Sequence, residues 1–228
     1  LSSLSYAKRK AKELNVNRVK VLGKGSISGV NINKFNLKNK NAFKTLKEYS
    51  TLKSTMLISL LKASYKKEIK IICFIGRVNK DKGIGELIKG FKLHNKEFAD
   101  SYLLIIGPNE LKDNEFRKVK ATKNCLHIDF FNDINLILPF AYCLILPSYR
   151  EGFGSIIIEA AASKVPIIAT NIPGPKDVII NKKHGMLINE TNSKEIIKSL
   201  EYLINLSEKD YSNMSFNCRK LAKDIFDV

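Results

Sequence analysis

Residues 145–170 read ILPSYREGFGSIIIEAAASKVPIIAT. The apolar run that ends at Leu146 is too short for a helix and too apolar for a surface loop, so it predicts a buried strand. Gly152 and Gly154 then form a turn in which a ligand can approach the main chain, because glycine carries no side chain. The segment after this turn favours a helix that ends at Pro166. The sequence here therefore predicts a strand, a glycine turn and a helix, in that order.

The predicted turn and helix also carry two carboxylates. The helix begins at the glycine turn, so its free N–H groups and positive dipole end form a suitable seat for a phosphate. Glu151 lies in the turn, and Glu159 lies about one and a half turns into the helix, within reach of the same crevice. A carboxylate there would accept hydrogen bonds from sugar hydroxyls. From the residues alone an alternative stays open, in which both glutamates are merely solvated.

Apolar runs and helical segments alternate along most of the chain. Strands are predicted near residues 69–75, 102–107, 125–130, 142–146, 166–169 and 186–188. Helices are predicted over residues 3–14, 42–64 and within 192–226, with a further short strand over 18–22. Alternation of this kind implies right-handed crossovers and a ligand site at the carboxyl ends of the strands. The predicted fold class is therefore α/β, with a Rossmann-like, mostly parallel sheet flanked by helices.

An ordered set of motifs resembles the retaining glycosyltransferases of family 4, in the carboxy-terminal domain of a GT-B fold. Glu151 and Glu159, seven residues apart within PSYREGFGSIIIEAAA, match the E-x7-E signature of that family. The other matching stretches are Phe74–Arg77, Lys80–Gly83, Leu103–Gly107, Ala169–Val178 and His184–Ile188. Val21–Ser26, Gly29–Asn31 and Phe35 resemble the hinge between the two domains of the family. The resemblance covers residues 19–205 and is far more specific than any one motif.

The resemblance assigns roles to individual residues. Arg77 and Lys82 would hold the diphosphate and stabilise the charge that develops on it as the leaving group departs. Glu151 would contact hydroxyls of the donor sugar and completes the predicted catalytic set. Glu159 would hold the ribose hydroxyls. The other predicted nucleotide-sugar-binding residues are Gly76, Gly107, Pro108, Phe131, Gly152, Phe153 and Gly154, of which Gly107, Pro108 and Phe131 would lie near the base.

The chain departs from the family pattern at two places. Family members often have a glycine where this chain reads Asp129-Phe130-Phe131, which puts the base contacts in question. Lys164 stands where a glycine is common before the proline, a departure that would alter only a turn.

The length of the chain fits one domain of a two-domain GT-B enzyme. We expect residues 1–40 to form the end of the amino-terminal domain and the hinge, and residues 41–228 to form the nucleotide-sugar-binding domain. The amino-terminal acceptor domain would then be missing. On this interpretation the chain binds nucleotide but turns over little or nothing by itself.

The resemblance implies a donor-binding domain of a retaining glycosyltransferase that transfers a sugar from a nucleotide sugar, most directly a UDP-sugar. The acceptor would be a glycan or a lipid-linked sugar, and the stretch NIPGPKDV (171–178) favours surface polysaccharide synthesis. No cofactor is predicted, and no Asp-x-Asp pair of the metal-binding type occurs, so metal-independent chemistry is favoured. The alternatives are a non-catalytic module that binds nucleotide sugars and, ranked below it, a basic nucleic-acid-binding protein.

The charge balance is the least specific signal. Thirty-nine basic and 22 acidic side chains give a net charge of +17, which suits nucleic acid, an anionic membrane surface or acidic substrates. The abundance of Lys, Asn and Ile, which share A/T-rich codons, offers a simpler explanation. No aromatic residue interleaves Lys8-Arg9-Lys10 or residues 38–40, so a nucleic-acid partner is not predicted. A peripheral contact with anionic lipid is compatible with the charge.

The remaining patterns are weaker. Four scattered cysteines fit a reducing cytoplasm better than a disulfide scaffold. Gly23–Gly29 resembles a dinucleotide fingerprint, but its last glycine is one residue late and no apolar helix follows. The three histidines stand without partners at metal-ligand spacing. No metal site is predicted.

Overall fold

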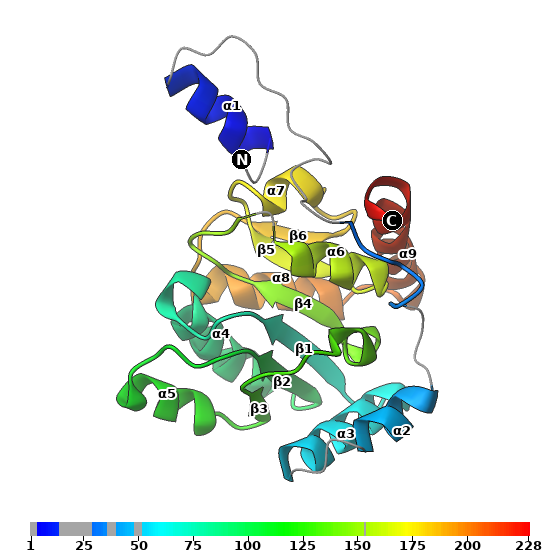
Figure 1. The fold of residues 1–228 in the computed structure, drawn as a ribbon. Helices are drawn as coiled ribbons and strands as arrows, with labels where there is room; N and C mark the ends of the chain where they lie inside the picture. The colour runs from blue at the N-terminus through cyan, green and yellow to red at the C-terminus, as the bar shows by residue number, and fades with distance from the viewer. Residues whose placement is uncertain (1–3, 14–28, 36–39, 48–51, 153) are drawn as a thin grey trace.

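The structure is a computed structural model and describes residues 4–13, 29–35, 40–47, 52–152 and 154–228. In these ranges six strands form one sheet: β1 (Lys70–Ile75), β2 (Ser101–Ile106), β3 (Cys125–Ile128), β4 (Cys143–Leu146), β5 (Ile167–Thr170) and β6 (Gly185–Ile188). All neighbouring strands are parallel, in the order β3-β2-β1-β4-β5-β6 (Figure 1). The α/β fold class and the six principal strands expected from the sequence are confirmed.

The strands form because their apolar residues are contiguous rather than alternating. Every residue of β4 and β5 is buried, as are the four central residues of β1. Continuous burial is typical of a parallel sheet that is covered on both faces. Cys73 and Cys143 lie in β1 and β4 as buried free thiols, and they pack as small apolar side chains.

Helices cover the two faces of the sheet. α4 (Ile84–Glu97) and α5 (Asp113–Lys120) follow β1 and β2, whereas α6 (Ser155–Ala162) and α7 (Pro175–Val178) follow β4 and β5. Strand order runs outward from β1 in one direction and from β4 in the other, so right-handed crossovers place the two sets on opposite faces. α8 (Ser193–Ile204) packs against α4, and α9 (Glu208–Phe226) packs against α6 (Figure 1). The predicted terminal helices are confirmed.

Ahead of the sheet, the structure corrects one expectation. α1 (Leu4–Glu13) matches the first predicted helix, but the predicted helix over 42–64 is described as α2 (Lys40–Lys47) and α3 (Leu52–Tyr65). The rings of Phe43 and Tyr65 lie edge to face with their centroids 6.3 Å apart. One continuous helix would separate these residues by about 33 Å. The chain therefore reverses between them, and the prediction of one helix is wrong. The short strand expected over 18–22 lies outside the described residues.

The segment 29–35 is attached to the end of α9. The N–H of Val30 donates to the carbonyl of Phe226 at 2.7 Å, and the N–H of Ile32 donates to the carboxylate of Asp227 at 3.2 Å. Arg219 of α9 donates to the carbonyl of Phe35 at 3.2 Å. Most of the predicted hinge, residues 21–26, lies outside the described residues. The boundary at residues 40 and 41 stays a prediction.

Short 3-10 helices complete the described elements: η2 (Lys80–Lys82), η3 (Ile134–Leu136) and η4 (Leu138–Phe140). η2 lies between β1 and α4, and η3 and η4 lie between β3 and β4. The carboxyl end of β1 leads through a loop to α4, and the carboxyl end of β4 leads through a loop to α6.

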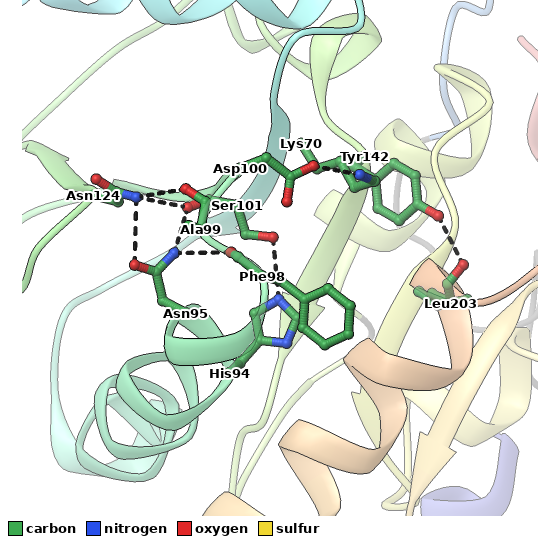
Figure 2. Close-up of polar contacts among 10 residues, drawn as sticks. All are labelled: Lys70, His94, Asn95, Phe98, Ala99, Asp100, Ser101, Asn124, Tyr142 and Leu203. Carbon is green, nitrogen blue, oxygen red and sulfur yellow. Dashed lines mark hydrogen bonds and ion pairs between the residues drawn. The ribbon is translucent and has the colours of Figure 1, made fainter.

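A polar network fixes the amino ends of the strands, at the opposite edge of the sheet from these loops (Figure 2). Lys70 and Asp100 form an ion pair at 2.5 Å, and the Ser101 hydroxyl lies 3.1 Å from Nε2 of His94. The phenol of Tyr142 donates to the carbonyl of Leu203 at 2.7 Å. Figure 2 also shows Asn95, Phe98, Ala99 and Asn124 in this network. These contacts pin the loop before β2 to α4 and leave the carboxyl edge free for a ligand.

The C-terminal end of α6 adopts a conformation that suits glycine. Lys164 has a φ of 63°, and its N–H bonds to the carbonyl of Ala161, while the N–H of Val165 bonds to that of Ala160. This pair of bonds is a Schellman motif, in which the left-handed residue is usually glycine. Lys164 therefore adopts the left-handed conformation that glycine usually provides at this turn, although it carries a Cβ atom.

We expect Lys164→Gly to raise the free energy of unfolding by about 1 kcal/mol, because it removes the cost of a left-handed lysine. Lys164→Ala is the matched control, since it removes the same charge and side chain but keeps the Cβ atom. Urea unfolding of the three proteins measures the difference. Equal stabilisation by both substitutions would point to charge relief instead of backbone strain.

The stability of the fold should fall in acid because two histidines are buried. Burial lowers the pKa of His94 and of His184 to about 4, below the ordinary value near 6.5. The unfolded chain binds these protons below pH 6.5, whereas the folded chain resists them until about pH 4. Stability is therefore present above pH 6.5 and lost towards pH 4, by on the order of 3 kcal/mol for each histidine. Urea unfolding between pH 7 and 4.5 should show this slope, and His94→Asn or His184→Asn should flatten it. A slope that both variants retain would contradict the assignment.

Candidate functional site

The loops after β1 and β4 meet at the centre of the carboxyl edge. The N–H of Tyr149 donates to the carbonyl of Asp81 at 2.8 Å. Gly83 has a φ of 68°, and a Cβ atom there would lie 2.1 Å from the carbonyl oxygen of Pro147. Strand order reverses between β1 and β4, which is where ligands bind in open α/β sheets.

Two predicted site residues form an ion pair across these loops. Nζ of Lys82 lies 2.7 Å from Oε2 of Glu151, and their side chains are only 16% and 13% exposed. The hydroxyl of Ser148 donates to the same oxygen at 3.2 Å, and the N–H of Gly152 donates to Oε1 at 3.3 Å. Lys82 is thus held at the carboxyl edge of the sheet by a carboxylate that is itself anchored in the loop after β4.

Arg77 is not part of that ion pair. Its Nη1 lies 3.4 Å from both carboxylate oxygens of Glu110, and Nδ2 of Asn79 donates to Oε2 of Glu110 at 2.7 Å. The Arg77 side chain is 60% exposed, in contrast with Lys82. The three predicted catalytic residues therefore lie at one edge of the sheet, but the structure divides them between two ion pairs.

Gly76 and Gly107 are fixed by the approach of two loops. Their φ angles are 153° and 143°, and a Cβ atom on Gly107 would lie 2.0 Å from the carbonyl oxygen of Gly76. Their N–H groups extend the sheet by donating to the carbonyls of Ile106 and Ile128 at 2.9 Å. Packing against the carbonyl of Gly76 therefore explains the glycine at position 107, whereas at position 76 a Cβ atom would meet only Phe74 at 3.8 Å and the positive φ is what favours glycine. Their contact with a ligand stays a prediction.

The glycine turn before α6 agrees with the expectation from the sequence. Gly154 is the N-cap of α6 with a φ of 73°, and no side chain caps the helix there. Gly152 is exposed, and a Cβ atom added to it would meet nothing within 4 Å. A Cβ atom on Gly174 would lie 1.8 Å from the carbonyl oxygen of Gly152, so the loop before α7 supports this turn. Phe153 lies outside the described residues.

Glu159 stands out because its carboxylate has no partner among the described residues. The side chain is half-buried on α6, and burial raises its pKa above the ordinary value for glutamate. A carboxylate withdrawn from water without a hydrogen bond is costly, and donor groups of a ligand would offset that cost. This environment suits the predicted contact with ribose hydroxyls.

The predicted base-binding residues are placed less closely together. Pro108 is exposed, and its carbonyl accepts the N–H of Val78 at 2.9 Å. Phe131 is half-buried against the core, whereas Phe130 is 73% exposed. No motif in the sequence marks His127, whose buried Nε2 lies 2.8 Å from the carbonyl of Gly107. A contact of Phe131 or Pro108 with a base stays a prediction.

Residues outside the predicted set complete the site. Ser148, Asn79, Glu110 and Gly174 support the predicted residues through the contacts above. Ser148, Asn79 and Glu110 could have been suspected, because each lies within three residues of a predicted position. In the described part of the chain, no three His, Cys, Asp or Glu side chains gather as a metal site would require. The dinucleotide-like segment falls on residues 23–28, outside the described residues, and on Gly29.

Comparison with a family model gives an independent assignment. Residues 61–221 match the model described as "Glycosyl transferases group 1". The matched segment contains the whole sheet, both ion pairs and Glu159.

Two curated relatives share this segment. The capsular polysaccharide biosynthesis glycosyltransferase CapM of Staphylococcus aureus is 30% identical over 221 residues, which cover 92% of this chain and 52% of CapM. The UDP-Gal:alpha-D-GlcNAc-diphosphoundecaprenol alpha-1,3-galactosyltransferase of Escherichia coli is 30% identical over 140 residues, which cover 60% of this chain and 36% of that enzyme. The chain therefore spans about half the length of CapM and about a third of the galactosyltransferase.

Solved structures share the fold. The C-terminal domain of the group 1 glycosyl transferase LpcC from Francisella tularensis matches with a TM-score of 0.68 at 24% identity, covering 88% of this chain and all of that domain. Anabaena HepE, solved with UDP and glucose, matches with a TM-score of 0.70 at 15% identity, covering 87% of this chain and 52% of HepE. At these identities the likeness concerns architecture.

The Lys82–Glu151 pair should contribute to stability, because each charge offsets the cost of burying the other. We expect Glu151→Gln to cost about 1–3 kcal/mol, since it leaves the ammonium group of Lys82 without a counter-charge. The double variant, Glu151→Gln with Lys82→Met, should lose much less stability than the sum of the losses in the two single variants. Urea unfolding of the four proteins gives the coupling. Additive costs would show that the two side chains do not interact.

Proposed function

Since the chain belongs to the Glycosyl transferases group 1 family, we propose that it is the donor-binding domain of a retaining, metal-independent glycosyltransferase that uses a UDP-sugar. The observation that carries this proposal is the arrangement at the carboxyl edge of the sheet. Lys82 is held by Glu151 beside the N-terminus of α6, which no side chain caps. The same helix carries Glu159, whose carboxylate has no partner among the described residues. Cations and helix N–H groups suit a diphosphate, and a lone carboxylate suits hydroxyls.

Each residue then has a task in sugar transfer. The hydroxyl oxygen of the acceptor forms a bond to the anomeric carbon while the bond from that carbon to the diphosphate oxygen breaks. The electron pair leaves with the diphosphate, which accepts the acceptor proton on the same face of the sugar. Lys82 and Arg77 stabilise the charge that develops on the leaving group. Glu151 contacts donor hydroxyls and Glu159 contacts the ribose, so neither needs to act as a nucleophile.

The choice of UDP follows from the relatives. The Escherichia coli relative is named as a UDP-Gal-dependent galactosyltransferase, and HepE was solved with UDP and glucose. The CapM relative is named for capsular polysaccharide biosynthesis, which supports a glycan or lipid-linked acceptor in surface polysaccharide synthesis. An amino-terminal acceptor domain is part of this proposal, because the chain covers 52% of CapM.

The proposed enzyme acts at the cytoplasmic side, with a peripheral contact to anionic lipid. No helix within the described residues has the length and apolar character needed to cross a membrane. The net charge of +17 supports attraction to an anionic surface.

Calorimetry with UDP, GDP and uridine tests the proposal. We expect UDP to bind, uridine to bind far more weakly, and Glu159→Ala to weaken UDP at least about tenfold, because hydrogen bonds to a charged group are lost. Glu201→Ala is the matched control, since Glu201 is a half-buried glutamate on α8. Absence of UDP binding would refute the proposal, and tight, salt-sensitive binding of oligonucleotides instead would favour a nucleic-acid partner. An unchanged UDP affinity in Glu159→Ala would refute the role of Glu159.

A further inference from the structure

Glu110 contacts one nitrogen of the Arg77 guanidinium group, which the proposed function assigns to the diphosphate. Nη1 of Arg77 lies 3.4 Å from Oε1 and 3.4 Å from Oε2 of Glu110. Nδ2 of Asn79 donates to Oε2 at 2.7 Å, which fixes the carboxylate from the other side. No role of Glu110 follows from the motifs in the sequence, because it lies just beyond them.

The backbone builds this contact. The N–H of Val78 donates to the carbonyl of Pro108 at 2.9 Å, and the N–H of Glu110 donates to the carbonyl of Val78 at 3.0 Å. Val78 and Asn109 form a parallel bridge between the loops after β1 and β2. Residues 77 and 110 therefore lie side by side because of main-chain pairing, so their ion pair does not depend on chance contacts of long surface side chains.

A carboxylate resembles a phosphate in what it offers to arginine. Both present two anionic oxygens that accept hydrogen bonds from the planar guanidinium group. Nη1 cannot serve both anions fully, and the two anions repel each other. The side chains of Arg77 and Glu110 are 60% and 40% exposed, so their ion pair is weak and readily exchanged. The Lys82–Glu151 pair differs, because it is largely buried.

We propose that Glu110 competes with the diphosphate for Arg77 and thereby lowers and sets the affinity of the site for nucleoside diphosphates. This inference rests on the proposed function, in which Arg77 binds the diphosphate. Glu110 takes back the guanidinium group as the diphosphate leaves, so it favours release of the product nucleotide. The effect depends on phosphate charge and leaves the nucleoside contacts unchanged. Glu110 is therefore a specificity-determining residue that does not touch the reacting atoms.

Glu110→Gln provides the test, because glutamine keeps an oxygen that can accept from Asn79 and removes the charge. We expect UDP to bind about two- to fivefold more tightly than to the unchanged protein, the range that corresponds to one exposed ion pair. Uridine affinity should stay the same. Glu115→Gln is the matched control, since Glu115 is also a carboxylate paired with a loop cation, Lys80, at 2.8 Å. It should leave UDP affinity unchanged.

Repeating the substitution in Arg77→Gln separates competition from general electrostatics. Arg77→Gln should weaken UDP binding, and Glu110→Gln should add little or no gain in that background. A loss of UDP affinity in Glu110→Gln would overturn the inference, because Glu110 would then be orienting Arg77. An equal gain in both backgrounds, or an equal gain from Glu115→Gln, would overturn it as well. If the unchanged chain does not bind UDP, the proposed function itself fails, and the inference fails with it.

Discussion

The pairing of β1 with β4 is the constraint on which the rest of the structure depends. These strands pair over only two residue positions, Ile72 with Cys143 and Cys73 with Leu144, whereas β1 and β2 pair over six. The remaining strands extend outward from β1 on one side and from β4 on the other. The helices that connect the two sets of strands therefore cover opposite faces of the sheet. The loops that leave β1 and β4 therefore have no strand between them and must meet each other. The candidate site therefore lies where the loops after β1 and β4 meet.

Close approach of main chains holds that region together. Gly83 packs on the carbonyl of Pro147, Gly107 on that of Gly76, and Gly174 on that of Gly152, with no room for a Cβ atom in any of the three. Contacts of this kind fix the loops without large apolar side chains at the crevice. Polar side chains such as Lys82 can then face a ligand while the loops stay in place. Gly83, Gly107 and Gly174, which lie in stretches that resemble ligand-binding motifs, are thus required by packing.

The fold could be predicted from the sequence wherever one local pattern decided the structure. Contiguous apolar runs such as Cys143–Leu146 are buried on both sides and gave unambiguous strands. The reversal that brings Phe43 to Tyr65 could not be predicted, because helical periodicity carries no signal for a change of direction. Lys80 and Lys82 look alike in the sequence, but η2 turns the first towards Glu115 and the second towards Glu151. The partners of Arg77 and Lys82 are set by tertiary contacts 33 and 69 residues away.

The charge of the whole chain is a poor guide to this site. Arg77 is balanced by Glu110 and Lys82 by Glu151, while Glu159 adds a carboxylate whose raised pKa reflects its burial. These five side chains therefore carry little net charge within a chain whose net charge is +17. They do not supply the excess of positive charge that would suit a nucleic acid of any sequence. In the proposed function a bound anion exchanges with Glu110 for Arg77 and brings hydroxyls to Glu159. A nucleoside diphosphate linked to a sugar carries both kinds of group, whereas inorganic phosphate carries only the first.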